Sequence, residues 1–239
     1  MMDKLTTILF DLDGTLLPMD QEVFTKAYFK RLVAKVAPLG YEPEALINGI
    51  WAGTAAMVKN DGACTNEEAF WHRFTQLFGE ETLKDRPVFD EYYRIEFQQV
   101  ADSCGFNPMA KSAVQQLSQK GYRVALATNP IFPAVATESR IRWAGLEPAD
   151  FAYYTTYENA TYCKPNPNYY RELLGKLGCS PEECLMVGND VKEDMVAQTI
   201  GMKVFLLTDC LINKENADIS QYPQGSFAQL LEYVDALSK

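Results

Sequence analysis

The sequence predicts an α/β protein in which a parallel sheet is covered by helices and an all-helical segment is inserted after the first strand. Short apolar runs alternate with helical segments through most of the 239 residues, a pattern typical of parallel sheets covered on both faces. Between about residues 18 and 106, by contrast, helical segments follow one another and no convincing strand occurs. This interval therefore reads as a separate small domain.

The first predicted strand, residues 7–12, is an apolar run that ends abruptly in acidic residues. Four helical stretches follow it at residues 21–36, 44–60, 66–78 and 88–100. An Asn-Asp-Gly sequence that begins at Asn60 is a strong turn signal between the second and the third. We expect hinges at residues 17–20 and 105–108. The sheet-containing core then comprises residues 1–17 and 107–239, and the insert comprises residues 18–106.

After the insert, helical and strand-like segments alternate again. Four further strands are predicted from short apolar runs at residues 123–128, 151–156, 184–188 and 203–207. Helices are predicted around them at residues 110–119, 134–143, 166–177, 191–200 and 227–236. Gly121 supplies a stop signal for the first of these helices.

The composition suits a folded globular protein and excludes several classes of function. Hydrophobic residues make up 47% of the sequence and the formal net charge is −10 without a basic tract, so nucleic acid is not expected as a partner. No apolar run approaches the ~20 residues that a membrane span requires, and no signal peptide is visible. The six cysteines form no C-x-x-C pair, so reduced thiols in a cytoplasmic protein are expected. For His72, the only histidine, we expect a surface or packing role.

Polar residues stand where four of the predicted strands end. Asp11 and Asp13 follow the first strand, and because alternate strand residues point the same way, both can project toward one site. In open parallel sheets, ligands bind beyond the carboxyl ends of the strands, so we expect the four ends to converge. The residues at these ends are Asp11, Asp13, Thr128, Asn129, Lys164, Asp190 and Asp194.

These residue types suit phosphoryl transfer. Grouped carboxylates, together with backbone oxygens and water, match the ligand preference of Mg²⁺. Once the metal and Lys164 offset its charge, Asp11 can stay ionised and attack as a nucleophile. Asp13 can give its proton to the leaving oxygen and later activate water. Thr128, the amide of Asn129 and Lys164 can stabilise the oxygens of the transferring group.

Each of these residues also has an ordinary structural explanation. Thr128 can bond to nearby backbone, and Lys164 can be a solvated loop residue. Asp190 can cap the helix predicted at residues 191–200, and Asp194 can complement the dipole of that helix. Together these explanations require four coincidences at four strand ends, so we favour a shared site.

The four motifs resemble those of the haloacid dehalogenase superfamily, which consists mostly of magnesium-dependent phosphatases. The matching stretches, in the family's order, are Asp11-Leu12-Asp13-Gly14-Thr15, Thr128-Asn129, Lys164-Pro165 and Gly188-Asn189-Asp190-x-x-x-Asp194. The resemblance implies a Rossmann-like core and a helical cap that closes over the site. It implies that Asp11 is phosphorylated during turnover. It also implies that Mg²⁺ is held by Asp11, by the backbone carbonyl of Asp13, by Asp190 and, directly or through water, by Asp194.

The leading hypothesis is thus a phosphatase that acts on a small phosphorylated metabolite. A sugar-phosphate mutase of the same fold and a catalytically silent binding module are the alternatives. A haloacid dehalogenase or a phosphonatase is disfavoured, because those relatives lack an acid equivalent to Asp13. Pro130 and Cys163 depart from the family's usual residues, which bears on substrate fit and not on the reaction class. The oligomeric state is open, and a monomer is compatible with the sequence.

The insert is less informative about function. Its aromatic residues are expected to form its own core and not a ligand site; they are Trp51, Phe70, Trp71, Phe74 and Phe78. Caps of the resembling family often present a substrate-selecting loop between their helices. We therefore expect the loop at residues 59–62, with Lys59 and Asp61, to meet the leaving group of the substrate.

Overall fold

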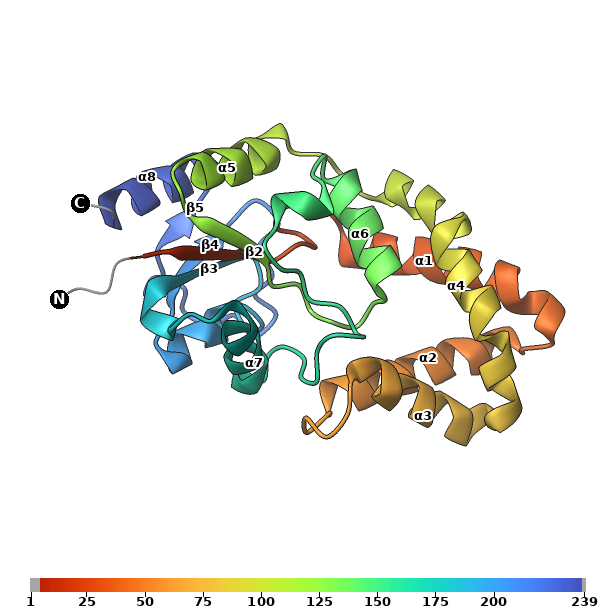
Figure 1. Ribbon diagram of the computed structural model, residues 1–239. Helices are drawn as coiled ribbons and strands as arrows, with labels where there is room; N and C mark the ends of the chain where they lie inside the picture. Colours follow the sequence, from red (N-terminus) through yellow and green to blue (C-terminus); the bar gives the residue numbers. More distant parts are fainter. Residues whose placement is uncertain (1–4, 238–239) are drawn as a thin grey trace.

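The computed structural model describes residues 5–237, which contain a five-stranded parallel sheet (Figure 1). The strand order is β2-β1-β3-β4-β5, and every neighbouring pair is parallel. The strands are β1 (Thr7–Phe10), β2 (Arg123–Leu126), β3 (Cys184–Gly188), β4 (Lys203–Leu207) and β5 (Gln224–Gly225). The predicted α/β class is confirmed.

The central strands are buried on both faces, as their continuous apolar sequences require. Every residue of β1 and β3 is buried. The register pairs Phe10 of β1 with both Leu126 of β2 and Val187 of β3. Because these three strands end at the same edge of the sheet, the residues that follow them are brought together there.

Helices cover the two faces of the sheet. Figure 1 shows α5 (Pro108–Gln119) and α8 (Phe227–Leu237) on one side and α7 (Pro167–Leu177) on the other. The alternation within β1 matches this arrangement, since Ile8 belongs to the apolar cluster that contains α5 and α8, whereas Leu9 belongs to the cluster that contains α7. The helix α6 (Ala134–Trp143) follows β2 and leads away from the sheet.

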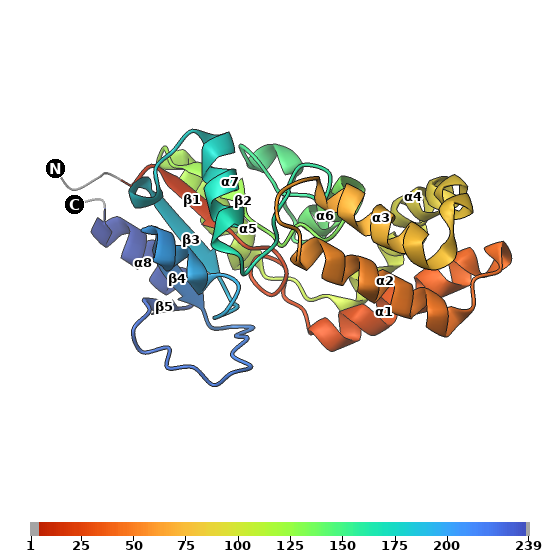
Figure 2. The same cartoon turned by 90° about the horizontal axis from the view of Figure 1, so that it is seen from below.

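The chain between β1 and β2 folds into a helical segment that lies at one end of the molecule (Figures 1 and 2). It contains α1 (Gln21–Val36), α2 (Pro43–Val58), α3 (Asn66–Phe78) and α4 (Arg86–Arg94). Three 3₁₀ helices connect or follow them, at Ala37–Leu39, Glu80–Asp85 and Glu96–Ser103.

Side-chain caps and an aromatic core define this helical segment. The Asp20 carboxylate accepts from two backbone amides at the start of α1, and Thr65 forms a capping box with Glu68 at the start of α3. Phe74 and Tyr92 are fully buried in the segment's own apolar cluster, which also receives Ala136 from α6. The chain enters and leaves the segment side by side, because the Gly105 amide donates to the Pro18 carbonyl over 2.7 Å.

Two predicted elements are wrong, and one strand was missed. Residues 151–156 do not form a strand; only Tyr154 makes an isolated parallel bridge, to Leu126. The α-helix predicted at residues 191–200 is replaced by a turn and a 3₁₀ helix at Met195–Ile200. The Asp190 carboxylate accepts from the amides of Lys192 and Glu193, and such local side-chain bonds compete with helix formation. The short strand β5 was not predicted.

The helix predicted at residues 88–100 is also divided. It ends as α4 at Arg94 and resumes as the 3₁₀ helix Glu96–Ser103. His72 is exposed on α3, in agreement with the expected surface role, and the six cysteines are free. Within residues 5–237, no helix has both the length and the apolar character that crossing a bilayer demands.

Candidate active site

A buried lysine joins three of the four predicted strand ends. Lys164 Nζ donates to Asp11 Oδ1 over 2.9 Å and to Asp194 Oδ1 over 2.6 Å. The Lys164 side chain is fully buried, and its two partners lie 153 and 30 residues away in the sequence. The convergence predicted from the sequence is therefore present for these three residues.

The charges of this group stabilise one another. Burial by itself lowers the pKa of Lys164, but the carboxylates of Asp11 and Asp194 outweigh burial and raise it well above its ordinary value. Burial raises the pKa of Asp194, against the opposing effect of the Lys164 ammonium. Lys164 therefore stays positively charged in a site from which water is largely excluded.

The loop after β1 holds Asp11 in place. The Asp11 amide donates to the Val187 carbonyl over 2.9 Å, and its Oδ2 accepts from Thr15 Oγ1 over 3.1 Å. Thr15 Oγ1 also lies 2.8 Å from Asn189 Oδ1, which ties this loop to the end of β3. Gly14 has a φ of 85°, and a Cβ there would lie 2.3 Å from Asn189 Nδ2. Only glycine fits that turn without displacing Asn189.

Asp13 faces a buried arginine that the sequence analysis did not identify. Arg140 of α6 is fully buried and forms an ion pair with Asp13 Oδ2. Its guanidinium also lies 4.4 Å from the centre of the Phe132 ring and donates to Thr137 Oγ1 over 3.3 Å. Burial raises the pKa of Asp13, and Arg140 opposes that rise. The other carboxylate oxygen, Asp13 Oδ1, is buried and has no hydrogen-bond partner among the described residues.

A pattern in the sequence could have indicated Arg140, although it was not recognised. It lies four residues after Ala136 and three after Thr137, so all three occupy one face of α6. Ala136 and Thr137 are buried there. A cation on the inner face of a helix needs an acidic partner, which here is Asp13.

The loop after β2 presents Thr128 and Asn129 to the same site. The Thr128 carbonyl accepts from Thr155 Oγ1 over 2.6 Å and from the Tyr169 hydroxyl over 2.9 Å. Asn129 Oδ1 accepts from the Lys164 amide over 3.2 Å. These bonds fix the backbone of the loop and connect it to the segment that carries Lys164.

The segment after β3 supplies Asp190, Asp194 and an acid that the sequence analysis missed. Asp190 Oδ1 accepts from the amides of Lys192 and Glu193, and Asp194 Oδ2 accepts from the Asp190 amide over 2.9 Å. Burial raises the pKa of Glu193 to about 7. Glu193 Oε2 accepts from Asn129 Nδ2 over 3.1 Å. In the sequence, only its position between Asp190 and Asp194 could have indicated that Glu193 belongs to the site.

The donor set fits a Mg²⁺ site in chemistry, although the side chains do not already form a closed cage. No group of three or more His, Cys, Asp or Glu side chains is gathered for metal binding in the part of the chain that the structure describes. Mg²⁺, however, usually keeps several water ligands and needs only one or two carboxylates. Asp11, Asp13 and Asp190 line one cavity, so their oxygens could share one ion.

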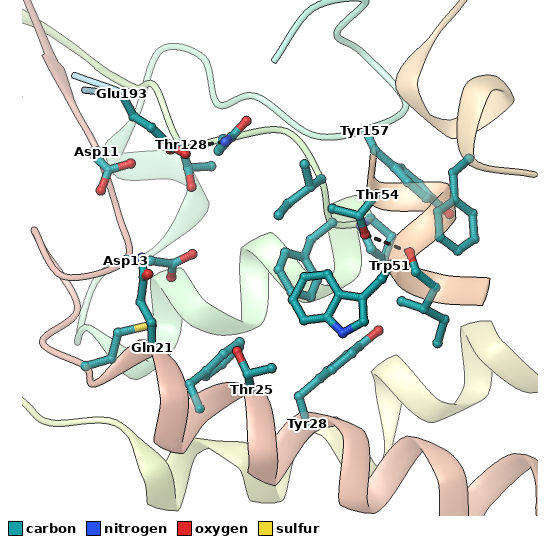
Figure 3. A pocket seen from close by; sticks show the side chains of 18 of the residues that line it. Asp11, Asp13, Gln21, Thr25, Tyr28, Trp51, Thr54, Thr128, Tyr157 and Glu193 are labelled. Atoms are coloured by element: carbon teal, nitrogen blue, oxygen red, sulfur yellow. Dashed lines mark hydrogen bonds between the residues drawn. The ribbon is translucent and has the colours of Figure 1, made fainter. Parts of the chain in front are cut away.

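The site opens into a cavity of about 370 Å³ between the sheet and the helical segment. The cavity has two chemically different ends. Figure 3 shows Asp11, Asp13 and Glu193 on one side and Trp51, Tyr28 and Tyr157 on the other. The acidic end is formed by residues that follow strands, and the aromatic end mainly by the helical segment.

The predictions for the helical segment are partly wrong. Trp71 and Phe74 are buried in the segment's core, as expected. Trp51 is not a core residue; its side chain is 49% exposed and lines the cavity. None of residues 59–62 is among the described residues that line the cavity. Gly62 of that loop instead lies so close to Tyr162 that a Cβ would be 2.3 Å from the tyrosine hydroxyl.

Comparisons with known proteins agree with this fold. A family model described as haloacid dehalogenase-like hydrolase matches residues 5–197. The chain is 29% identical over 202 residues to a phosphoglycolate phosphatase from Yersinia pseudotuberculosis, covering 84% of this chain and 80% of the relative. It is 25% identical over 212 residues to the pyrophosphatase PpaX from Bacillus velezensis, covering 84% and 82% of the two chains.

A solved structure shares the fold over nearly the whole chain. It is a 2-haloacid dehalogenase from Pseudomonas syringae pv. Tomato DC3000, with a TM-score of 0.64, 20% identity, and coverage of 97% of this chain and 98% of that one. The family model covers most of the chain and includes every predicted site residue from Asp11 to Asp194. The protein belongs to the haloacid dehalogenase-like hydrolases.

Proposed function

We propose that the protein is a magnesium-dependent phosphatase that hydrolyses a small phosphate monoester through a phosphorylated Asp11. The observation that supports this most is the Lys164 ammonium, which is fully buried and bonded to the carboxylates of both Asp11 and Asp194. A fixed positive charge beside a carboxylate suits stabilisation of a transferring phosphoryl group. Two of the relatives are themselves named as phosphatases of small phosphorylated compounds.

The proposed reaction has two steps. An oxygen of Asp11 attacks phosphorus, the bond from phosphorus to the leaving oxygen breaks, and protonated Asp13 gives its proton to that oxygen. The Thr128 hydroxyl, the Asn129 amide and Lys164 bind the other phosphoryl oxygens. Asp13, now a carboxylate, then takes a proton from a water molecule that attacks the phosphorus, which releases phosphate and restores Asp11.

The metal belongs to the same proposal. Asp11, the backbone carbonyl of Asp13 and Asp190 would hold Mg²⁺, and Asp194 would act directly or through water. The ion would supply charge neutralisation at the phosphoryl oxygens. The bond from Lys164 to Asp194 gives Asp194 a second role, which is to position the lysine.

We also propose that residues 18–106 act as a cap over the site, with residues 1–17 and 107–239 as the catalytic core. Three features support this division: the separate aromatic core of the helical segment, its two adjacent connections, and its contribution to the wall of the cavity. A cap that excludes water would protect the phosphorylated aspartate from premature hydrolysis by bulk solvent.

Phosphate release from a chromogenic phosphate ester tests the reaction. The parent protein should release phosphate with Mg²⁺ present and lose activity when EDTA is added, with recovery when Mg²⁺ is restored. Asp11→Asn should lower kcat by at least about 10³-fold, because an amide cannot form the acyl phosphate. The matched control is Asp150→Asn in the exposed 3₁₀ helix Pro148–Asp150, which should retain the parent rate. Near-parent turnover by Asp11→Asn would refute the covalent route.

A further inference from the structure

We propose that the leaving group of the substrate is bulky, apolar and ring-bearing, and that it carries no negative charge. This inference rests on the proposed phosphatase function and specifies its substrate class. It concerns the end of the cavity opposite Asp11 and Asp13, where the non-phosphate part of an ester would lie (Figure 3).

Aromatic side chains from several elements form this end of the cavity. Phe24 and Tyr28 come from α1, Trp51 from α2 and Tyr93 from α4. Phe132, from the loop before α6, contacts both Tyr28 and Arg140 and so connects this wall to the Asp13 side. Figure 3 shows Tyr28 and Trp51 facing the same space. Such a wall favours apolar rings, since aromatic pairs in edge or offset contact contribute beyond the burial of their area.

Trp51 is the clearest sign that this wall is a binding surface. Ten large hydrophobic side chains are exposed among residues 5–237, and of these ten Trp51 alone lines the cavity. It packs against Phe29 on one side, with ring centres 5.5 Å apart, and leaves 49% of its surface open. A large apolar group exposed inside a concave site marks a binding surface more strongly than one on a convex face.

Three hydroxyl groups of the wall already have hydrogen-bond partners. The hydroxyls of Tyr28 and Tyr93 lie 2.9 Å apart and bond to each other. Thr54 Oγ1 donates to the Ile50 carbonyl of its own helix over 2.9 Å. These three groups therefore offer mainly rings and a methyl group to a ligand, and the hydroxyls of Thr25 and Tyr157 also line the cavity.

The charges around the cavity disfavour a second anionic group on the substrate. Lys214 is the only lysine or arginine among the described residues that line it. Lys164 is fully buried and bonded to two carboxylates, and Arg140 is paired with Asp13. Asp90 adds a carboxylate at the aromatic end. Lys214 follows Ile212, which bridges to Asp190, so this lysine belongs to the acidic end. A carboxylate or second phosphate on the leaving group would lose its water at the aromatic end without gaining a cation there.

Alkyl phosphates, whose leaving groups are all primary alcohols, test this inference with only small differences in chemical reactivity. The four substrates are ethyl phosphate, 2-phenylethyl phosphate, phosphoglycolate and phosphocholine, each assayed for phosphate release with Mg²⁺. We expect kcat/KM for 2-phenylethyl phosphate to exceed that for ethyl phosphate and phosphoglycolate by at least tenfold. Similar values for the first three substrates, or a preference for phosphoglycolate, would overturn the inference and leave the phosphatase proposal intact.

The remaining outcomes are also decisive. A tenfold preference for phosphocholine over 2-phenylethyl phosphate would replace the apolar leaving group with a cationic one held by the aromatic rings and Asp90. Absence of turnover for all four esters and for the chromogenic ester would refute the phosphatase proposal itself, and this inference with it.

Variants at Trp51 separate ligand contact from folding. Trp51→Ala should lower the ratio of kcat/KM for 2-phenylethyl phosphate to kcat/KM for ethyl phosphate about tenfold, whereas Trp51→Phe should recover most of that ratio. The control is Leu77→Ala on α3, which removes a large apolar side chain from a residue that is 46% exposed and lies outside the cavity. It should leave both substrates unaffected. Equal losses for both substrates in Trp51→Ala would show that the residue does not select the leaving group.

Discussion

Removal of the Arg140 guanidinium should destabilise the protein by an amount that depends on pH. Arg140→Met keeps an unbranched apolar side chain in a site where the arginine side chain is fully buried. Removing one member of a buried ion pair typically costs 3–5 kcal/mol, because the other charge is left without compensation. The Asp13 side chain is 25% exposed, so some water reaches it. The free energy of unfolding should therefore fall by about 3 kcal/mol at pH 7.

The pH dependence follows from the pKa of Asp13. Burial already raises this pKa, and Arg140 opposes the rise, so the variant should have a still higher Asp13 pKa. Above about pH 4, the unfolded chain then releases a proton that the folded variant retains. Because the folded variant binds the proton over a wider range than the folded parent, the stability of the variant relative to the parent should fall as pH rises from the raised Asp13 pKa of the parent to the still higher one of the variant.

Urea unfolding, followed by circular dichroism in the presence of EDTA at several pH values, measures this effect. A double-mutant cycle with Asp13→Asn isolates the pair, since Arg140→Met should cost much less once the carboxylate has been removed. We expect a coupling energy above about 2 kcal/mol at pH 7. Additive losses within about 0.5 kcal/mol, or a loss that does not change with pH, would refute the reasoning.

Three further predictions concern neighbouring residues. Lys164→Met leaves the carboxylates of Asp11 and Asp194 without their shared cation. Urea unfolding at pH 7 should therefore show a free energy of unfolding lower by about 3–5 kcal/mol, and an unchanged midpoint would contradict the proposed pairing. Burial raises the pKa of Glu193 to about 7. As pH rises from 4.5 to 7, the free energy of unfolding of the parent should therefore fall by up to about 3 kcal/mol relative to that of Glu193→Gln. Parallel stability curves for the two proteins would argue against that shift. Gly14→Ala should cost at least about 2 kcal/mol, because it adds a clash with Asn189 to the strain of a positive φ. Gly40→Ala, at a φ of 87° with nothing within 4 Å of the new Cβ, should cost only about 1 kcal/mol, and thermal melts of the two variants test the difference.

The parts of the fold that could be predicted are those set by local patterns. The strand predicted at residues 184–188 and the helix predicted at residues 21–36 match β3 and α1, because a buried apolar run and a capped helix are visible within a few residues of sequence. The strand predicted at residues 151–156 failed for a non-local reason. Tyr154 pairs only briefly with Leu126, and how far a segment pairs depends on its position relative to its neighbour in space.

The candidate site divides in the same way. The carboxylates and the lysine were identified because charged residues at strand ends are unusual and the topology brings such ends together. Trp51 could not be distinguished from the aromatic core residues of its segment, since helical periodicity indicates a face and not what that face contacts. Its exposure inside the cavity depends on how the helical segment sits against the sheet, which no local pattern encodes.

The adjacent connections of the helical segment bear on how such proteins diversify. The 2.7 Å bond between the Gly105 amide and the Pro18 carbonyl brings the two ends of the segment together like the base of a closed loop. A module joined in this way can be exchanged for another of different size without altering the length or the pairing of any strand. The chemical step and the choice of compound could then evolve independently, one by point changes at the strand ends and the other by replacement of the whole module.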